Sequence, residues 1–420
     1  MIMKKHILFA ALAALCLSSC QKEDVTIPAD ELIPRKDIVL TKAQADFVLV
    51  NNSFALDLFR RVAESGEGKS LLISPLSVTI DFGMVNNGAV GTTQQEIYQT
   101  LGFEEGSVDG LNAFCQTMME QSAAVDPSTT LEIANAAIVN SLYPGLKDSF
   151  TQTVKSAYDA EVIYKDFGKE NIQKLVNDWC DKKTHGMIPE LLKDPVSPLE
   201  YAHFLNAVYF KGIWANKFKK ADTQKETFTR EDGSKITVSM MHQKNKFPFG
   251  GIPGLCTSVT LPYGNQAYRM ELLLPVEGKT LSDLVEALAS GNTYAASSAT
   301  LGGVEVDVKI PSFETEYFTS LRDILPQMGI RRAFDPMGAD FSAMSSTPNL
   351  YVGDVLHKAK IKVDEEGSEA AAVTDIVMEY ASAGPGTSQV FEFHADRPFL
   401  YLITEISTGA IYFIGQYTGK

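Results

Sequence analysis

The segment VDEEGSEAAAVTDIVMEYASAGPGTSQVFEFHADRP, residues 363–398, decides how the rest of the chain is interpreted. Between Ser368 and Glu379 its residues alternate: one parity carries small and then apolar side chains, and the other carries every charge. The first set is Ser368, Ala370, Ala372, Thr374, Ile376 and Met378. Because successive side chains of a strand point to opposite faces, this alternation predicts a half-buried strand.

The same segment has a second interpretation and a different kind of end. The Ala-rich run Glu369–Tyr380 also has reasonable helix propensity. It is followed by ASAGPGTSQ, residues 381–389, a small and polar tract that is typical of an exposed loop. A latent strand joined to an exposed loop predicts a segment that can occupy two places in the molecule.

Two motifs of this segment resemble the serpin family. Residues 363–372 (VDEEGSEAAA) resemble the hinge of the serpin reactive loop, and residues 393–399 (FHADRPF) resemble the strand that follows this loop. The resemblance implies that the loop is bait for a protease and that, once cut, its N-terminal part inserts into the central sheet. The hinge residues that it implies are Glu365, Gly367, Ser368, Glu369, Ala370, Ala371, Ala372 and Val373.

The resemblance also places the bond that a protease would cleave. The family's spacing, counted from Glu365, lands on Ala381–Ser382, and a small residue before the bond suits an elastase-like enzyme. Tyr380, one residue earlier, is the alternative and would suit chymotrypsin-like enzymes. The implied partners are therefore serine proteases of either kind, with papain-like cysteine proteases as a further class.

A second group of motifs resembles the region where the central sheet of serpins opens. It lies in residues 71–77 (LLISPLS) and 204–214 (FLNAVYFKGIW) and near His357. The residues implied for this region are Ser74, Ser77, Asn206, Trp214 and His357. Helix capping, which serine favours, is an equally good reason for Ser74 and Ser77, and both interpretations can hold.

Asn206 lies within an otherwise apolar predicted strand. Burying an amide without partners costs roughly 1–3 kcal/mol. We therefore expect Asn206 to be paired, and the resemblance implies His357 and Ser74 as its neighbours.

Local patterns in the rest of the chain predict ordinary helices and strands. Apolar residues recur at helical spacing from Lys42 to Glu64, and Val304–Ile310 alternates apolar and charged residues as a strand with one wet face does. Phe399–Thr404 and Ala410–Tyr417 flank a turn at residues 407–409 and predict a hairpin. The resemblance covers about residues 45–420.

The expected fold class is α+β. Of the 420 residues 45% are hydrophobic and 21% are charged, which suffices for a large core, and we see no linker or repeat after residue 45. The resemblance implies a single domain with a large central mixed sheet, further sheets, about eight or nine helices and an exposed reactive-centre loop at about residues 367–392. We expect a monomer. The net charge of −15 argues against a nucleic-acid partner.

The N-terminus has the pattern of a targeting signal. Lys4 and Lys5 precede the apolar run Ile7–Leu17, which is too short to span a bilayer as a helix. Residues 17–20 (LSSC) resemble a bacterial lipoprotein signal, which implies a signal peptide over residues 1–19, lipidation of Cys20 and a tether over residues 20–44. The alternative is an ordinary secretory signal cleaved nearby. A lipoprotein would be anchored to the outer membrane of the cell envelope, facing either the periplasm or the outside.

Enzyme motifs are absent from the sequence. It contains no G-x-S-x-G, no H-E-x-x-H and no CxxC metal spacing, and its histidines are scattered singly. We therefore expect a protease inhibitor with no catalytic residues, metal or cofactor of its own. The alternative function is that of a non-inhibitory serpin acting as a binding or carrier protein. The small hinge residues Ala370–Ala372 favour inhibition.

Overall fold

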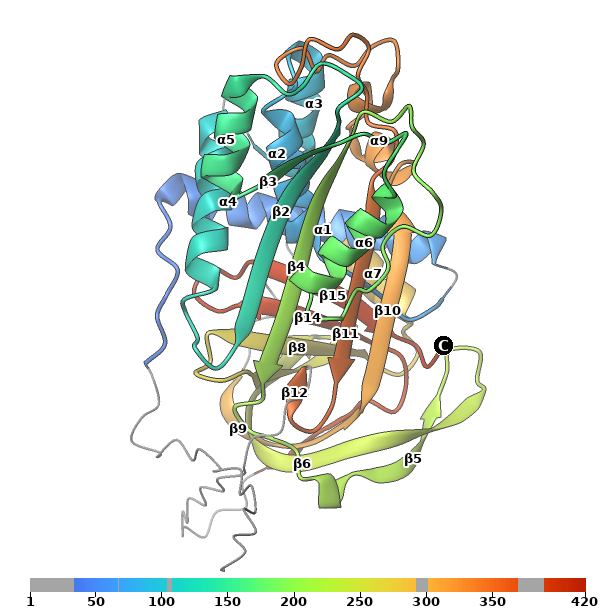
Figure 1. Cartoon of the computed structure of the whole chain (residues 1–420). Coiled ribbons are helices and arrows are strands. Elements are labelled where there is room, and N and C mark those ends of the chain that lie inside the picture. Colours follow the sequence, from blue (N-terminus) through green and yellow to red (C-terminus); the bar gives the residue numbers. More distant parts are fainter. Residues whose placement is uncertain (1–33, 67, 104–107, 292–300, 369–388) are drawn as a thin grey trace, which may run out of the picture.

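The computed structural model describes residues 34–66, 68–103, 108–291, 301–368 and 389–420. Within these ranges the chain forms eight α-helices and two large β-sheets (Figure 1). The helices are α1 Lys42–Ser65, α2 Pro75–Asn86, α3 Gly91–Leu101, α4 Val108–Ser122, α5 Asp148–Tyr158, α6 Ile172–Lys183, α7 Leu281–Ala289 and α9 Ile324–Met328. The helical spacing predicted from Lys42 is confirmed by α1.

The smaller sheet has six strands, and its middle holds the candidate site. Its strands, in spatial order, are β10 Phe313–Ser320, β11 Leu356–Val363, β12 Gly367–Ser368, β4 Ala202–Ile213, β2 Thr130–Asn140 and β3 Glu161–Lys165. Every neighbouring pair is antiparallel except β2 and β3. The two-residue β12 lies between β11 and β4, which therefore run parallel to each other.

The larger sheet has nine strands and contains the C-terminal hairpin. Its main path is β1 Leu71–Ile73, β15 Ile411–Tyr417, β14 Phe399–Glu405, β8 Tyr268–Pro275, β7 Cys256–Pro262, β6 Lys235–Ile252, β9 Leu301–Pro311 and β13 Phe391–His394, and β5 Gln224–Thr229 pairs with β6. The predicted strand at Val304–Ile310 and the predicted hairpin are confirmed by β9 and by the β14–β15 pair. The α+β fold with large sheets is likewise confirmed.

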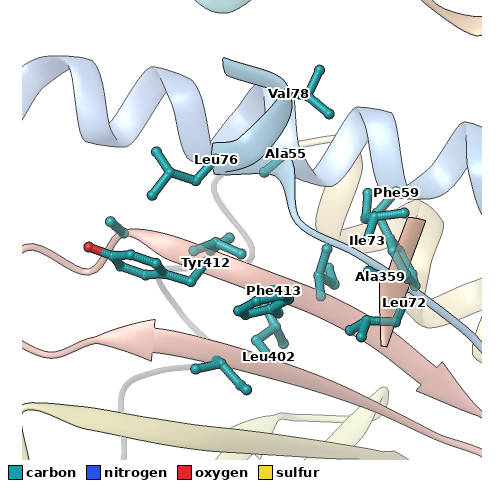
Figure 2. Packing of buried hydrophobic residues seen from close by; sticks show 14 of the residues in the cluster. Ala55, Phe59, Leu72, Ile73, Leu76, Val78, Ala359, Leu402, Tyr412 and Phe413 are labelled. Atoms are coloured by element: carbon teal, nitrogen blue, oxygen red, sulfur yellow. The ribbon is translucent and has the colours of Figure 1, made fainter. Parts of the chain in front are cut away.

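Helix α2 is the centre of the main hydrophobic core. It begins with Pro75 at its first turn and is capped by Ser74, whose side chain accepts from the Ser77 amide. Leu76 points toward the β15 layer that includes Tyr412 and Phe413, as Figure 2 shows. A helix that is apolar on nearly every side must be enclosed by other elements, and α2 packs between the two sheets.

Helix α6 covers the opposite face of the six-stranded sheet (Figure 1). Its apolar side chains, Val176 and Trp179 among them, pack in a separate cluster on Leu205 and Ala207 of β4. The central strands β4 and β11 are therefore covered by α2 on one face and by α6 on the other. Within the described residues, no helix has the length and apolar character needed to cross a membrane.

Candidate functional site: the opening between β4 and β11

A tight turn after β11 starts a new strand between β11 and β4. Asp364 N donates to Gly367 O at 2.9 Å, and Gly367 N donates back to Asp364 O at 3.3 Å. The turn is supported from within, because Glu366 N donates to the Asp364 carboxylate at 3.0 Å. Ser368 then pairs with Val363 of β11 on one side and with Gly212 of β4 on the other. The chain therefore turns back into the space between β11 and β4, which we call the opening.

Two glycines allow this turn to lie directly on β4. A Cβ atom on Gly367, whose φ is +157°, would lie 2.0 Å from the carbonyl oxygen of Gly212. A Cβ on Gly212 would in turn lie 2.6 Å from the ring of Tyr263. Neither distance is compatible with a side chain, so both positions require glycine for close backbone approach.

Trp214 donates two hydrogen bonds to this turn. The residue is 3% exposed, and its ring stacks on Tyr263 with 4.4 Å between centroids and 10° between planes. Trp214 Nε1 donates to Asp364 O at 2.8 Å, and its backbone N donates to Glu366 O at 2.9 Å. Tyr263 OH bonds to Ser368 Oγ at 2.6 Å. We call Asp364–Ser368 together with Trp214 and Tyr263 the hinge base.

The two glutamates of the hinge base are bonded to the segment that follows β4. Glu365 accepts from Thr223 Oγ1 at 2.7 Å through its carboxylate and from Phe218 N at 3.0 Å through its carbonyl. Glu366 pairs with Lys217 at 2.9 Å and with Lys220 at 3.6 Å. Glu365 and Glu366 therefore anchor the turn.

A second group of polar side chains lies farther along the opening, beneath the sheet. Ser74 N donates to His357 Nε2 at 3.0 Å, which joins α2 to β11. Ser77 Oγ donates to Asn206 Oδ1, and Asn206 Nδ2 donates to Asn135 Oδ1 at 2.7 Å, which joins α2 to β4 and β2. We call Ser74, Ser77, Asn135, Asn206 and His357 the central cluster.

Asn206 is paired, as expected, but with different partners. Its two hydrogen bonds go to Ser77 and Asn135. The implied neighbours His357 and Ser74 are bonded to each other and reach Asn206 only through Ser77, whose amide donates to Ser74 Oγ at 3.4 Å. The correction has a simple cause: Ser77 is one helical turn beyond the cap residue Ser74 and points toward β4.

His357 is a neutral acceptor in this cluster. Burial lowers the pKa of its imidazole to about 4. This direction agrees with its hydrogen bond, because the Nε2 atom that accepts from Ser74 N must be unprotonated. His357 thus joins β11 to α2 without a charge at neutral pH.

The remaining predicted site residues lie outside the described residues. These are the distal hinge Glu369, Ala370, Ala371, Ala372 and Val373, the cleavage candidates Tyr380, Ala381 and Ser382, and the lipidation candidate Cys20. The structure therefore brings together Glu365, Gly367, Ser368 and Trp214 at the hinge base, and Ser74, Ser77, Asn206 and His357 in the central cluster. Within the described ranges, no three His, Cys, Asp or Glu side chains could hold a metal ion.

Sequence reasoning missed three residues of this site. Asn135 had a usable signal, since it is an amide within the apolar strand Thr130–Asn140, as Asn206 is within its own strand. Gly212 had a weaker signal, a glycine inside a strand, which often marks close approach of another backbone. Tyr263 had none, because its role depends on the tertiary contact with Trp214.

The comparisons agree with this geometry. The family model described as Serpin (serine protease inhibitor) matches residues 49–419. The human leukocyte elastase inhibitor is 32% identical over 377 residues, which are 88% of this chain and 98% of that protein.

Two solved structures are similar over nearly their whole length. Native tengpin, a thermophilic serpin, has a TM-score of 0.80 and 26% identity, with 92% of this chain and 97% of tengpin covered. Human thyroxine-binding globulin with bound thyroxine has a TM-score of 0.79 and 26% identity, with 89% and 98% covered. On the family model, the relatives and the fold together, the chain belongs to the serpin family of protease inhibitors.

Proposed function

We propose that this protein inhibits elastase-like or chymotrypsin-like serine endopeptidases as a suicide substrate. The observation that carries the proposal is β12: Gly367 and Ser368 already form the first rung of a strand between β11 and β4. The residues that follow Ser368 on its side of the strand begin with the small Ala370 and Ala372. The entry point for strand insertion is therefore formed, and the sequence beyond it fits.

The proposed reaction starts as ordinary proteolysis. The protease serine attacks the carbonyl carbon of Ala381, the peptide bond to Ser382 breaks, and the Ser382 amine leaves with a proton. The protease is then joined to Ala381 by an ester. Insertion of the segment after Ser368 carries this acyl-enzyme away before water hydrolyses it, as in the loop insertion known for serpins.

The local energetics of insertion are close to balance. Burial of Ile376 and Met378 would contribute roughly 1.5–3 kcal/mol each, and each new ladder hydrogen bond roughly 0.5–1.5 kcal/mol. Ordering a flexible loop opposes this by about 1–2 kcal/mol per residue. Most of the driving force must therefore come from strain released elsewhere in the fold.

The test is to incubate the intact domain with pancreatic elastase, neutrophil elastase, chymotrypsin, trypsin and subtilisin. Each mixture is resolved on a denaturing gel, and the mass of the released C-terminal peptide is measured by mass spectrometry. We expect a covalent band and a peptide that begins at Ser382, or at Ala381 if Tyr380 precedes the bond. Cleavage with no covalent band for any enzyme would contradict inhibition and favour the carrier alternative.

A hinge variant separates trapping from cleavage. Ala372→Glu would force a charge into the enclosed face of the inserting strand, and burying an unpaired charge is strongly unfavourable. We expect this variant to be cut at the same bond without forming the covalent band. Ala372→Ser, which changes the same position without adding a charge or much volume, is the matched control and should retain trapping. Full trapping by Ala372→Glu would refute insertion in this chain.

We also propose that the protein is a lipoprotein anchored to the outer membrane through Cys20. The support is the sequence pattern at residues 1–20. The full chain with native Cys20 should incorporate labelled palmitate and partition into detergent, whereas Cys20→Ser should do neither. Added protease would then distinguish an outward-facing domain, which it digests on intact cells, from a periplasmic one.

A further inference from the structure

Helix α2 carries one acidic residue on the side that faces the opening. Within α2, all of which the structure describes, every residue except Asp81 is buried. Asp81 follows Ser77 by four residues, so both lie on the same face of the helix. Because Ser77 is bonded to Asn206 of β4, Asp81 lies beneath the sheet, one turn beyond the central cluster.

The Asp81 carboxyl group is poorly compensated. Its Oδ1 atom is shielded from solvent and accepts no hydrogen bond from the described residues. Burial accordingly raises the pKa of this carboxyl well above its usual range. Since Asp81 as a whole is half-buried, whereas its helix neighbours are enclosed, solvent reaches α2 at this residue.

Within the part of the chain that the structure describes, no basic side chain forms an ion pair with Asp81. On β11, Lys358 is already bonded to Glu316 at 2.7 Å and to Glu190 O at 2.7 Å. Burial lowers the pKa of His357 to about 4, so it is neutral. On α6, burial and, second to it, the Asp81 carboxylate raise the pKa of the Cys180 thiol to about 12.

The other sides of α2 carry groups that stay neutral near pH 7. Burial raises the pKa of Tyr98 on α3 and of Cys115 on α4, each to about 12, and also raises that of Tyr158 on α5. The Lys358 partner Glu316 is held ionised by that lysine, whose hydrogen bond lowers the Glu316 pKa. Asp81 is therefore the carboxyl at this face of α2 that is placed to change charge.

The register of β12 indicates what an inserting strand would place over Asp81. Ser368 is opposite Gly212 in an antiparallel pair, so continuing the ladder puts Thr374 opposite Asn206 and Ile376 opposite Phe204. Opposite residues share a face, and the Asn206 side chain points toward α2. Helix α2 runs from the central cluster toward Phe204, because a Cβ atom on Gly88, just beyond its end, would lie 3.2 Å from the ring of Phe150, which packs on Phe204.

We propose that Asp81 is a protonation-controlled brake on strand insertion between β4 and β11. Insertion covers the Asp81 turn with the aliphatic Ile376 and removes the solvent that reaches the carboxylate. An ionised carboxylate without a partner resists this burial, whereas the neutral acid does not. Insertion is therefore slow at high pH and faster as the pH falls. The inference rests on the proposed function only in assuming that this gap accepts a strand.

The test measures insertion without a protease. A fluorescent peptide with the sequence of residues 369–380 is incubated with the intact domain between pH 5 and 8, and incorporation is followed by anisotropy. We expect uptake by the native protein to become faster as the pH falls from 8 to 5, by at most about tenfold per pH unit, because one proton converts the ionised carboxylate to the neutral acid. Asp81→Asn should be fast and independent of pH.

Two variants serve as controls. Asp178→Asn removes an exposed carboxylate of α6 that is paired with Lys174, and His203→Gln removes a half-buried imidazole of β4 that is paired with Glu200. Both should keep the pH dependence of the native protein. An unchanged slope in Asp81→Asn, a flat native profile, or no peptide uptake by either protein would overturn the proposal.

The Asp81 proposal and the proposed inhibitory function would be contradicted by different results. If no protease forms a covalent band but the pH dependence of peptide uptake is lost in Asp81→Asn, the role of Asp81 is supported and the inhibitory function is contradicted. If a covalent band forms but Asp81→Asn keeps the native pH dependence, the inhibitory function is supported and the role of Asp81 is contradicted.

Discussion

The hinge base and the central cluster hold the same opening by different means. At the hinge base, main-chain hydrogen bonds and the stacked rings of Trp214 and Tyr263 fix the turn directly against β4. In the central cluster, single side-chain bonds through Ser77 and His357 join α2 to the two strands. The difference indicates that the hinge base fixes where an inserting strand enters the sheet. The hydrogen bonds of the central cluster, by contrast, must break and re-form when a strand inserts.

The largest effect is expected at the hinge base, from Trp214→Ala. The change removes a buried ring together with the donor to Asp364 O, and such truncations cost about 3–5 kcal/mol. Urea unfolding of the intact domain measures the loss. Trp214→Phe keeps a ring on Tyr263 and should recover more than half of it; equal losses in the two variants would show that stacking contributes little.

The central cluster should respond to pH through His357. Its pKa is lowered to about 4 in the folded protein, against an ordinary value near 6.5. The folded state thus binds this proton less readily than the unfolded state does, so stability is fully present above pH 6.5 and is lost as the pH falls toward 4. The loss amounts to about 3 kcal/mol.

The check is the free energy of unfolding between pH 7 and 4 for the native protein and for His357→Gln. The glutamine oxygen can still accept from Ser74 N but does not titrate. The variant should show a shallower slope by about the same 3 kcal/mol over this range. Equal slopes of the unfolding free energy against pH in the two proteins would mean that burial does not keep His357 in its neutral form.

Gly367 tests how closely the turn approaches β4. Gly367→Ala would place a methyl group within 2.0 Å of Gly212 O, and the strained backbone should destabilise the fold by about 1–3 kcal/mol. Gly353→Ala is the matched control, because nothing lies within 4 Å of its added Cβ. The thermal midpoints of the two variants should differ, and identical midpoints would refute the close approach.

Much of the fold follows from local patterns in the sequence. The α1 helix, β9 and the β14–β15 hairpin were predictable because their apolar residues repeat with the period of a helix or a strand. The serine cap of α2 was predictable for a similar reason, since Ser74-Pro75 is a local signal.

The candidate site was only partly predictable. The presence of Ser77, Asn206 and His357 in one region could be inferred from the family resemblance, but their pairing could not. Which of two serines meets Asn206 depends on the rotation of α2 against β4, and that is set by packing over the whole core. The unpaired, partly buried carboxyl group of Asp81 likewise could not be predicted from the sequence, since an aspartate on a helix is ordinarily exposed.

The smallest expected effects give the sharpest contrast between the two regions. Ser77→Ala removes one hydrogen bond of the central cluster, and Thr223→Val removes one at the hinge base, to Glu365. Each should cost about 1 kcal/mol. If the cluster is the part that rearranges, Ser77→Ala should speed peptide uptake severalfold, because the bond lost in the variant is one that the native protein must break first. Thr223→Val should leave the rate unchanged at the same loss of stability, and equal acceleration in both would mean that insertion tracks global stability rather than the central cluster.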